Sequence, residues 1–118
     1  MAWEIEATGE FQDWFAGLRP AVRVAVAGKV DLLEEVGPAL GRPHVDTIHQ
    51  SRFPNMKELR IQHGGDAYRV LFAFDPRRAA ILLVGGRKGS KTWYAKNIAV
   101  ADRLYAEYLK DLKKEGLI

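Results

Sequence analysis

The sequence predicts a small α+β fold with the element order β-α-α-β-β-β-α and a mainly antiparallel, twisted sheet. Apolar residues recur at helical spacing near both ends of the chain, whereas the middle consists of short apolar runs separated by turn residues. Short turns imply antiparallel neighbours, and the helices must then cover one face of the sheet. The chain has 118 residues, 47% of them hydrophobic, and no cysteine. We therefore expect residues 1–118 to form a single domain whose core holds without disulfides.

The N-terminal third predicts one strand followed by two helices. Residues 3–7 alternate apolar and charged side chains, which is the period of a half-buried strand. Apolar side chains then recur at helical spacing at Phe11, Trp14, Phe15 and Leu18. A second helix is expected from Pro20 to about Val36, because proline is tolerated in a first turn. Its buried stripe consists of Val22, Val26, Val30 and Leu33. Gly37 and Pro38 are expected to end it.

The rest of the chain predicts three strands and a last helix. Residues 37–55 contain several prolines and glycines and no sustained period, so we expect a long irregular connection there. The strands are expected at residues 56–61, 68–75 and 79–86, joined by turns at 63–66 and 75–78. Asn97 is expected to cap a final helix that runs to about Lys114.

Positive charge is concentrated in the second half of the chain, although the net charge is only +3. Residues 52–96 carry ten lysines or arginines against three acidic residues, a net charge of +7 from ten minus three. This bias suits a polyanionic partner, either a nucleic acid or an acidic protein segment. A solvated charged surface is the alternative interpretation.

Two arginines are expected to meet on the uncovered face of the sheet. The turn between the first two central strands makes Arg60 and Arg69 direct cross-strand neighbours, which costs stability unless an anion lies nearby. That anion is either Glu58 or a bound phosphate. Arg87 follows the third strand, and guanidinium groups bind phosphate oxygens bidentately. The three arginines therefore form a candidate phosphate clamp, and we expect neither Arg69 nor Arg87 to belong to the core.

The basic loop after the third strand suggests contacts with RNA. Residues 85–92 nearly match a phosphate-binding loop, but Ser90 occupies the position that requires glycine, so nucleotide hydrolysis is not expected. Trp93 and Tyr94 follow this loop, and each can either stack on a base or anchor the loop to the core. We expect Trp93 to be the anchor and Tyr94 to be functional. The candidate RNA contacts are Lys57, Lys88, Lys91 and Trp93.

No metal, cofactor or membrane segment is expected. His44 and His49 are five residues apart, which does not fit a helical pair of metal ligands. The longest uncharged apolar run is far shorter than the roughly 20 residues that cross a bilayer. The N-terminal segment is acidic where a signal peptide is basic, so we expect a cytoplasmic protein. His63 is expected in a turn, either as an acid or base near neutral pH or as an ordinary solvated residue.

Four segments resemble the RelE/HigB-like toxins of bacterial type II toxin–antitoxin modules, most closely the phage-derived HigB-like branch of the RelE/ParE superfamily. These segments are Pro54–Arg60, Tyr68–Asp75, Ile81–Lys88 and Asn97–Tyr105, and the Leu-Arg and Tyr-Arg pairs of the first two are the most specific parts. The resemblance covers nearly the whole chain. It implies a RelE-like fold and a ribosome-associated mRNA endonuclease that inhibits translation and is held inactive by a cognate antitoxin.

The resemblance also implies a set of catalytic residues. By position these are Arg60, Arg69, Arg87 and Tyr94, with Trp93 as the alternative to Tyr94. Where RelE has a lysine two residues before its Leu-Arg arginine, this chain has Glu58, so the general base stays open among Glu58, His63 and a loop lysine. Metal-free cleavage would use the 2′-hydroxyl of the RNA as the nucleophile. The alternative function is that of a ParE-like toxin, which shares the fold but binds and inhibits DNA gyrase without catalysis.

Overall fold

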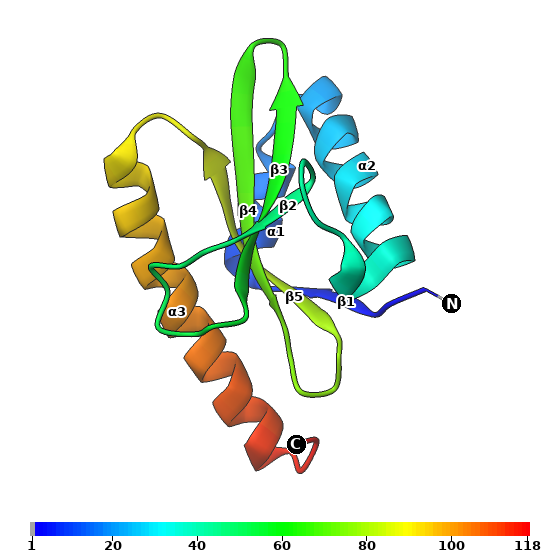
Figure 1. The fold of residues 1–118 in the computed structure, drawn as a ribbon, viewed down its shortest axis with the longest axis vertical. Coiled ribbons are helices and arrows are strands. Elements are labelled where there is room, and N and C mark those ends of the chain that lie inside the picture. Colours follow the sequence, from blue (N-terminus) through cyan, green and yellow to red (C-terminus); the bar gives the residue numbers. More distant parts are fainter. Residues whose placement is uncertain (1) are drawn as a thin grey trace.

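The computed structural model describes residues 2–118 and places a five-stranded sheet between helices on both of its faces (Figure 1). The elements in chain order are β1 (Ile5–Ala7), α1 (Gly9–Ala16), α2 (Pro20–Val36), the 3-10 turn η1 (Gly37–Ala39), β2 (Val45–Thr47), β3 (Met56–His63), β4 (Asp66–Phe74), β5 (Ala80–Arg87) and α3 (Lys91–Lys114). The strand order is β1-β5-β4-β3-β2. β1 runs parallel to β5, and every other neighbouring pair is antiparallel. The expected α+β class is therefore confirmed.

The two N-terminal helices begin and end where local chemistry requires. Thr8 caps α1, because its Oγ1 accepts a hydrogen bond from the Phe11 amide (3.0 Å) and donates one to the Leu83 carbonyl (2.6 Å). α2 spans Pro20–Val36, as expected. Gly37 follows it with a φ of 72°, which glycine adopts without strain. A side chain at this position would also collide with the indole of Trp3.

Both faces of the central strands are buried. On one face, side chains of β3 and β4 pack against α1 and α2, and the core there includes Phe11, Val22, Val26, Leu33, Leu59, Val70 and Phe72. On the other face, the core includes Met56, Leu71, Ala73, Leu83, Ile98, Ala101, Leu104 and Tyr105, the last four from α3. Figure 1 shows α3 on the side of the sheet opposite α1 and α2. The expectation that one face lies open is wrong, because the apolar stripe of α3 covers it.

The last helix starts seven residues earlier than expected, because its N-cap residue is Ser90 rather than Asn97. Asn97 does not cap it, because its side-chain amide donates to the Trp93 carbonyl one turn back (2.8 Å). The early start depends on a tertiary contact, since the Trp93 indole lies against Gly86 so closely that a Cβ on that glycine would collide with it. Local sequence carries no sign of this packing.

Residues 37–55 are more ordered than the expected irregular connection. They contain η1 and the three-residue strand β2, which pairs with β3 at the sheet edge. The residues around this strand include prolines and glycines and show no sustained alternation, unlike those around β1, so the sequence pattern did not reveal it. The rest of the segment is fixed to α3, because Asp102 accepts hydrogen bonds from the Ser51 hydroxyl and the Arg52 amide.

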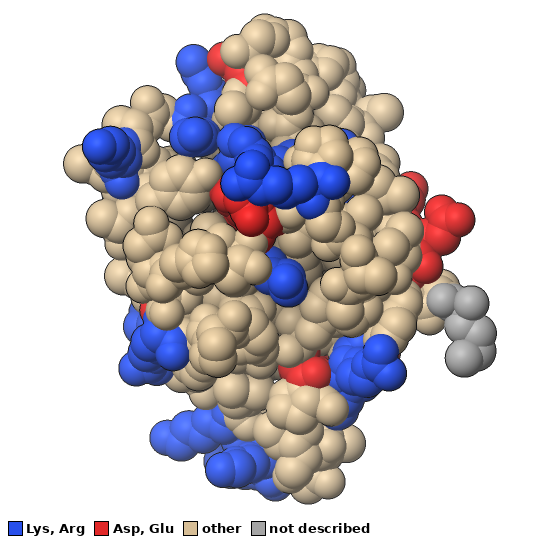
Figure 2. All heavy atoms as spheres, viewed as in Figure 1, with Lys and Arg blue, Asp and Glu red and all other residues tan. Residues whose placement is uncertain are grey.

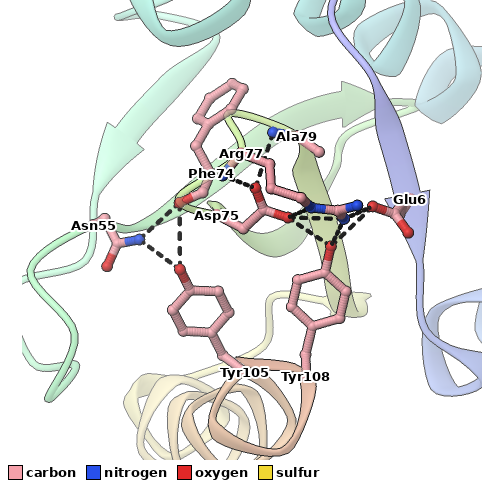
Figure 3. A network of polar contacts seen from close by, with 8 residues as sticks. All are labelled: Glu6, Asn55, Phe74, Asp75, Arg77, Ala79, Tyr105 and Tyr108. Carbon is pink, nitrogen blue, oxygen red and sulfur yellow. Dashed lines mark hydrogen bonds and ion pairs between the residues drawn. The ribbon is translucent and has the colours of Figure 1, made fainter. Parts of the chain in front are cut away.

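A polar network joins α3 to the end of the sheet that lies far from the basic loop (Figure 3). The Tyr108 hydroxyl lies 2.7 Å from Asp75 Oδ2 and 2.9 Å from Glu6 Oε2. Arg77 donates to Glu6 Oε2 (2.6 Å), Asp75 Oδ2 (3.2 Å) and the Tyr108 hydroxyl (3.0 Å). The network therefore ties β1, the β4–β5 turn and α3 together.

Asp75 is the buried centre of this network, with 4% of its surface exposed. Burial alone would raise the pKa of its carboxyl group. Hydrogen bonds from the Tyr108 hydroxyl, the Ala79 amide and Arg77 outweigh burial and hold that pKa below its ordinary value of 3.8. The ionised carboxylate therefore stabilises the fold above its unfolded-state pKa, and this contribution is lost as the pH falls through the lower folded-state pKa.

We predict that Asp75→Asn lowers the free energy of unfolding near neutral pH by about 1–3 kcal/mol, because two amides and a hydroxyl lose a charged acceptor. The difference between wild type and variant should shrink in acid, below the ordinary carboxyl pKa of 3.8, where the wild-type carboxylate also becomes protonated. Urea denaturation across this pH range measures both effects. A difference that stays constant with pH would contradict the assignment.

Candidate functional site

The candidate site lies on the sheet face covered by α3, at the end where β3 and β4 meet the first turns of that helix. The expected cross-strand register is confirmed, since Arg60 pairs with Arg69 and Ile61 with Tyr68. Figure 2 shows basic side chains gathered across this end of the molecule, over the ends of the central strands and the start of α3, with acidic atoms directly beneath them.

Three side chains from three elements converge at the centre of the site, and we call Glu58, Arg69 and Tyr94 the central cluster. The Tyr94 hydroxyl donates to Glu58 Oε1 at 2.6 Å. Arg69 Nε lies 3.2 Å from both the Tyr94 hydroxyl and Glu58 Oε1. Arg69 Nη1 donates to the backbone carbonyl of Tyr68 (3.0 Å). Glu58 is thus the anion beside Arg69 in this structure.

The two charged members of the central cluster are buried, because Glu58 is 8% and Arg69 5% exposed, and Tyr94 is half-buried. The expectation that Arg69 lies outside the core is therefore wrong. α3 extends over the strand face that the sequence analysis left open, and it removes the arginine from solvent. Glu58 sits diagonally across the β3–β4 ladder from Arg69, where long side chains can meet.

Burial also sets the protonation of Tyr94. Desolvation, and after it the hydrogen bond to Glu58, raises the pKa of the Tyr94 hydroxyl above its ordinary value, and Arg69 opposes this shift only in part. The phenol is therefore protonated at neutral pH and serves as a hydrogen-bond donor. The cluster combines a carboxylate that can accept a proton, a phenol that can give one and a guanidinium that can hold an anion.

Three other candidates lie at the start of α3 and just before it. Lys88 places its Nζ 5.6 Å from the centre of the Tyr94 ring. Lys91 is exposed in the first helical turn. Trp93 packs edge-on against Tyr94, with ring centres 5.1 Å apart, and also covers Gly86. Trp93 therefore fixes the position of the helix start that carries Tyr94.

Arg87 lies on the other face of the sheet from Arg69. It stands opposite Tyr68 in the β4–β5 ladder, and Tyr68 belongs to the core on the α1 and α2 side. Its guanidinium lies 3.4 Å from the Asp66 carboxylate, and its side chain is 69% exposed. The structure does not bring Arg87 to the central cluster.

A β-bulge accounts for this placement. Leu71 and Phe72, consecutive in β4, pair with Val84 and Leu82 of β5, which leaves Leu83 as an extra residue. An extra residue reverses the alternation of side chains beyond it. An unbroken β5 would direct Arg87 to the same face as Arg69, whereas the bulge directs it to the opposite face.

Lys57 and His63 also lie away from the central cluster. Side chains alternate along a strand, so both residues share the face of Leu59, which belongs to the core on the α1 and α2 side. His63 stands opposite Asp66 at the end of the β3–β4 hairpin. Glu58 and His63 were both candidates for the general base, and only Glu58 contacts Arg69 and Tyr94.

One cation near the site, Lys29 of α2, was not among the residues predicted from the sequence. It lines a cavity of about 260 Å³ together with Arg60 and Arg69. The signal was present, because Lys29 falls between Val26 and Leu33, within the stripe that faces the sheet. A lysine at that position interrupts an otherwise apolar helix face.

Two further properties concern only residues 2–118, which the structure describes. No three histidine, aspartate or glutamate side chains in this range are grouped as metal ligands. None of the helices in this range is long and apolar enough to cross a membrane.

Comparison with known proteins places the chain in a family. The model of the family described as "Phage derived protein Gp49-like" matches residues 13–106. The chain belongs to this Gp49-like, HigB family. It is 48% identical over 102 residues to a protein of Mycobacterium tuberculosis described as the toxin HigB3, covering 85% of this chain and 88% of HigB3. It is 46% identical over 99 residues to one described as the toxin HigB2, of which it spans about half (49%).

Solved structures share the fold of this HigB-family chain. The isolated RelE toxin of Escherichia coli superimposes with a TM-score of 0.60 at 13% identity, covering 83% of this chain and 97% of RelE. The RelE–RelB complex of Pyrococcus horikoshii gives a TM-score of 0.56 at 16% identity, covering 75% of this chain and 98% of its match. The RelE-like fold and the relationship to HigB toxins are confirmed, and the chain is a toxin of the type II toxin–antitoxin class.

We predict that Arg69→Ala lowers the free energy of unfolding by about 3–5 kcal/mol, because it leaves the Glu58 carboxylate buried without its counter-charge. The double variant Glu58→Gln, Arg69→Met should recover most of this loss, since no buried charge remains. Arg87→Ala is the matched control and should cost no more than about 1 kcal/mol, because its ion pair is exposed. Guanidinium denaturation measures all three. Equal losses for Arg69→Ala and Arg87→Ala would contradict this account.

Proposed function

We propose that this chain is an endoribonuclease toxin that cleaves mRNA during translation and is neutralised by a cognate antitoxin. The observation that carries the proposal is the convergence of Glu58, Arg69 and Tyr94 at hydrogen-bonding distance on a basic face. A base, an acid and an anion-binding group are the three functions that metal-free RNA cleavage requires. Membership of the HigB family supports this interpretation.

The cleavage step assigns one function to each member of the central cluster. The 2′-hydroxyl oxygen attacks the adjacent phosphorus as Glu58 accepts its proton. The bond from phosphorus to the 5′-oxygen breaks as Tyr94 donates its proton to that oxygen. The products are a 2′,3′-cyclic phosphate and a 5′-hydroxyl. Glu58 can then return its proton to Tyr94 across their 2.6 Å hydrogen bond, which restores both groups.

Arg69 would stabilise the charge that develops on the phosphate. The Nε and Nη1 atoms of Arg69 already have partners, and this fixes the plane of its guanidinium before substrate arrives. Preorganised donors of this kind stabilise a transition state by roughly 2.7–4 kcal/mol each. Arg60 is only partly buried and lies beside Arg69 across the ladder, so it can contact a neighbouring phosphate of the same RNA.

The antitoxin is proposed as the second partner. The RelBE2 toxin–antitoxin complex of M. tuberculosis and the RelE–RelB complex of P. horikoshii contain chains with the same fold. The charge of +7 over residues 52–96, from ten basic and three acidic side chains, would attract acidic groups of an antitoxin as it attracts RNA. Ribosome and mRNA are the proposed targets of the free toxin.

The proposal is tested by inducing the chain in bacteria with and without its antitoxin. Induction alone should arrest growth and produce cuts within translated reading frames, which primer extension on several mRNAs locates. Co-expression of the antitoxin should abolish both effects. Growth arrest with intact mRNA and trapped gyrase–DNA complexes would instead establish the ParE-like alternative.

We predict that Glu58→Gln and Tyr94→Phe each slow cleavage on programmed ribosomes by about 10²–10⁴-fold, the range for loss of a general base or acid. Single-turnover kinetics measures the rate. Both variants keep the shape of the side chain, and thermal melts followed by circular dichroism verify that they fold. Lys110→Gln, an exposed residue near the far end of α3, is the control and should cleave at the wild-type rate.

The same assay decides between the candidate bases. A folded Glu58→Gln variant with the wild-type rate, together with a slow His63→Gln variant, would move the general base to His63.

A further inference from the structure

A cationic cavity adjoins the central cluster at Arg69, with Lys29 of α2 in its lining. It has a volume of about 260 Å³ and is lined by Lys29, Pro43, Arg60, Ile61, Gln62 and Arg69. Its lining therefore includes three cationic side chains and no carboxylate. The cavity follows the edge of β3 beyond the short strand β2, where Lys29 of α2 approaches the sheet. Because Arg69 belongs both to this lining and to the central cluster, the two sites are continuous.

The position of Lys29 is fixed by a histidine. Lys29 Nζ lies 2.6 Å from Nδ1 of His44, in the segment that leads into β2. An ammonium group can only donate, so Nδ1 accepts, and the ring proton is assigned to Nε2. The His44 carbonyl also accepts a hydrogen bond from the Arg60 amide at 2.8 Å. One residue thus holds both the Lys29 ammonium and the backbone of Arg60, while Lys29 keeps two N–H groups for a ligand.

The positive charge of this cavity is only partly balanced locally, because Asp46 lies within electrostatic range of Arg60 and shares its charge with Arg42. Within the described range, no carboxylate lies within the 4.0 Å ion-pair distance of Lys29 or Arg60. Two acidic residues of the neighbouring strands form closer ion pairs elsewhere, Asp46 with Arg42 (2.6 Å) and Glu58 with Arg69 (3.2 Å). Half-buried like charges with only a partial counter-charge are unfavourable, and an anion in the cavity would reduce that cost.

We propose that this cavity binds the RNA phosphate adjacent to the one that is cleaved, with Lys29 and Arg60 as its ligands and His44 as the positioning residue for Lys29. This inference rests on the proposed endoribonuclease function. Single-stranded RNA presents a phosphate at every nucleotide, so a chain that reaches Arg69 must place its next phosphate close by. The cavity has room for a phosphate group and several waters, each of which occupies about 30 Å³.

The site differs from the other basic side chains around the cluster. Lys88 and Lys91 are exposed, and no hydrogen bond holds their ammonium groups in the described residues. Lys29, by contrast, is half-buried and has a fixed direction. A fixed cation specifies where a phosphate binds, whereas flexible surface lysines contribute attraction without position.

The test measures binding of a short single-stranded RNA whose 2′-hydroxyls are methylated, so that it cannot be cleaved. Fluorescence anisotropy over a series of salt concentrations gives both the affinity and the dependence of log K on log salt. Lys29→Gln should weaken binding and reduce the magnitude of that slope by about 0.7, the value for one lost contact with single-stranded nucleic acid. Arg60→Gln should do the same. Lys29→Arg, which keeps the charge, should retain the slope.

The control is again Lys110→Gln, which removes an exposed lysine far from the cavity and should leave the slope unchanged. Thermal melts establish that each variant folds, and Arg60→Gln provides the test if Lys29→Gln does not. Folded Lys29→Gln and Arg60→Gln variants with wild-type affinity and slope would overturn the subsite, as would the absence of wild-type RNA binding at low salt.

Two further outcomes distinguish the phosphate subsite from the proposed endoribonuclease function and from a binding site for the antitoxin. Wild-type protein that binds RNA through Lys29 but never cleaves mRNA on ribosomes overturns the proposed function and retains the subsite. The Lys29→Gln variant can also be tested with an acidic peptide of matched charge. If it loses binding to that peptide but binds RNA as the wild type does, the subsite is overturned and the cavity is assigned to the antitoxin.

Discussion

The structure depends on two buried carboxylates that α3 satisfies with tyrosine hydroxyls. Tyr94 donates to Glu58 near the start of the helix, and Tyr108 lies 2.7 Å from Asp75 near its end. In each case an arginine lies at the same carboxylate. The two tyrosines are about four turns apart, so they lie on nearly the same helix face. The apolar residues between them fill the core below, which holds α3 across the sheet along most of its length.

This arrangement makes the candidate site part of the fold rather than an addition to its surface. Glu58 and Arg69 are exposed by less than a tenth, and both are held by groups from neighbouring elements. Such burial fixes the geometry that acid–base chemistry needs, but it couples chemistry to stability. Removal of one member therefore exposes the other to an uncompensated desolvation cost. Isosteric changes such as Glu58→Gln separate the two effects better than truncation to alanine.

Sequence reasoning predicted the parts of the fold that local chemistry determines. The Gly-rich turn at residues 63–66 fixed the β3–β4 register, and side-chain alternation then brought Arg60 opposite Arg69. The start of α3 could not be predicted from the sequence, because it depends on Trp93 packing against Gly86. The direction in which Arg87 points could not be predicted either. That direction depends on one extra residue in β5, and an apolar strand with no polar side chains to mark its faces carries no signal for a bulge.

Charge composition alone did not define the site, because several of the basic side chains are paired with carboxylates. Of the basic residues between positions 52 and 96, Arg69, Arg77 and Arg87 are each paired with a carboxylate. Their charge is largely neutralised where it stands. Lys29 lies outside that window, yet the fold places it beside Arg60 without an acidic partner in the described residues. Attraction for a polyanion at close range depends on such unbalanced charge in a confined space, where the field is focused. The position of each charge, rather than its count, therefore determines where a phosphate would bind.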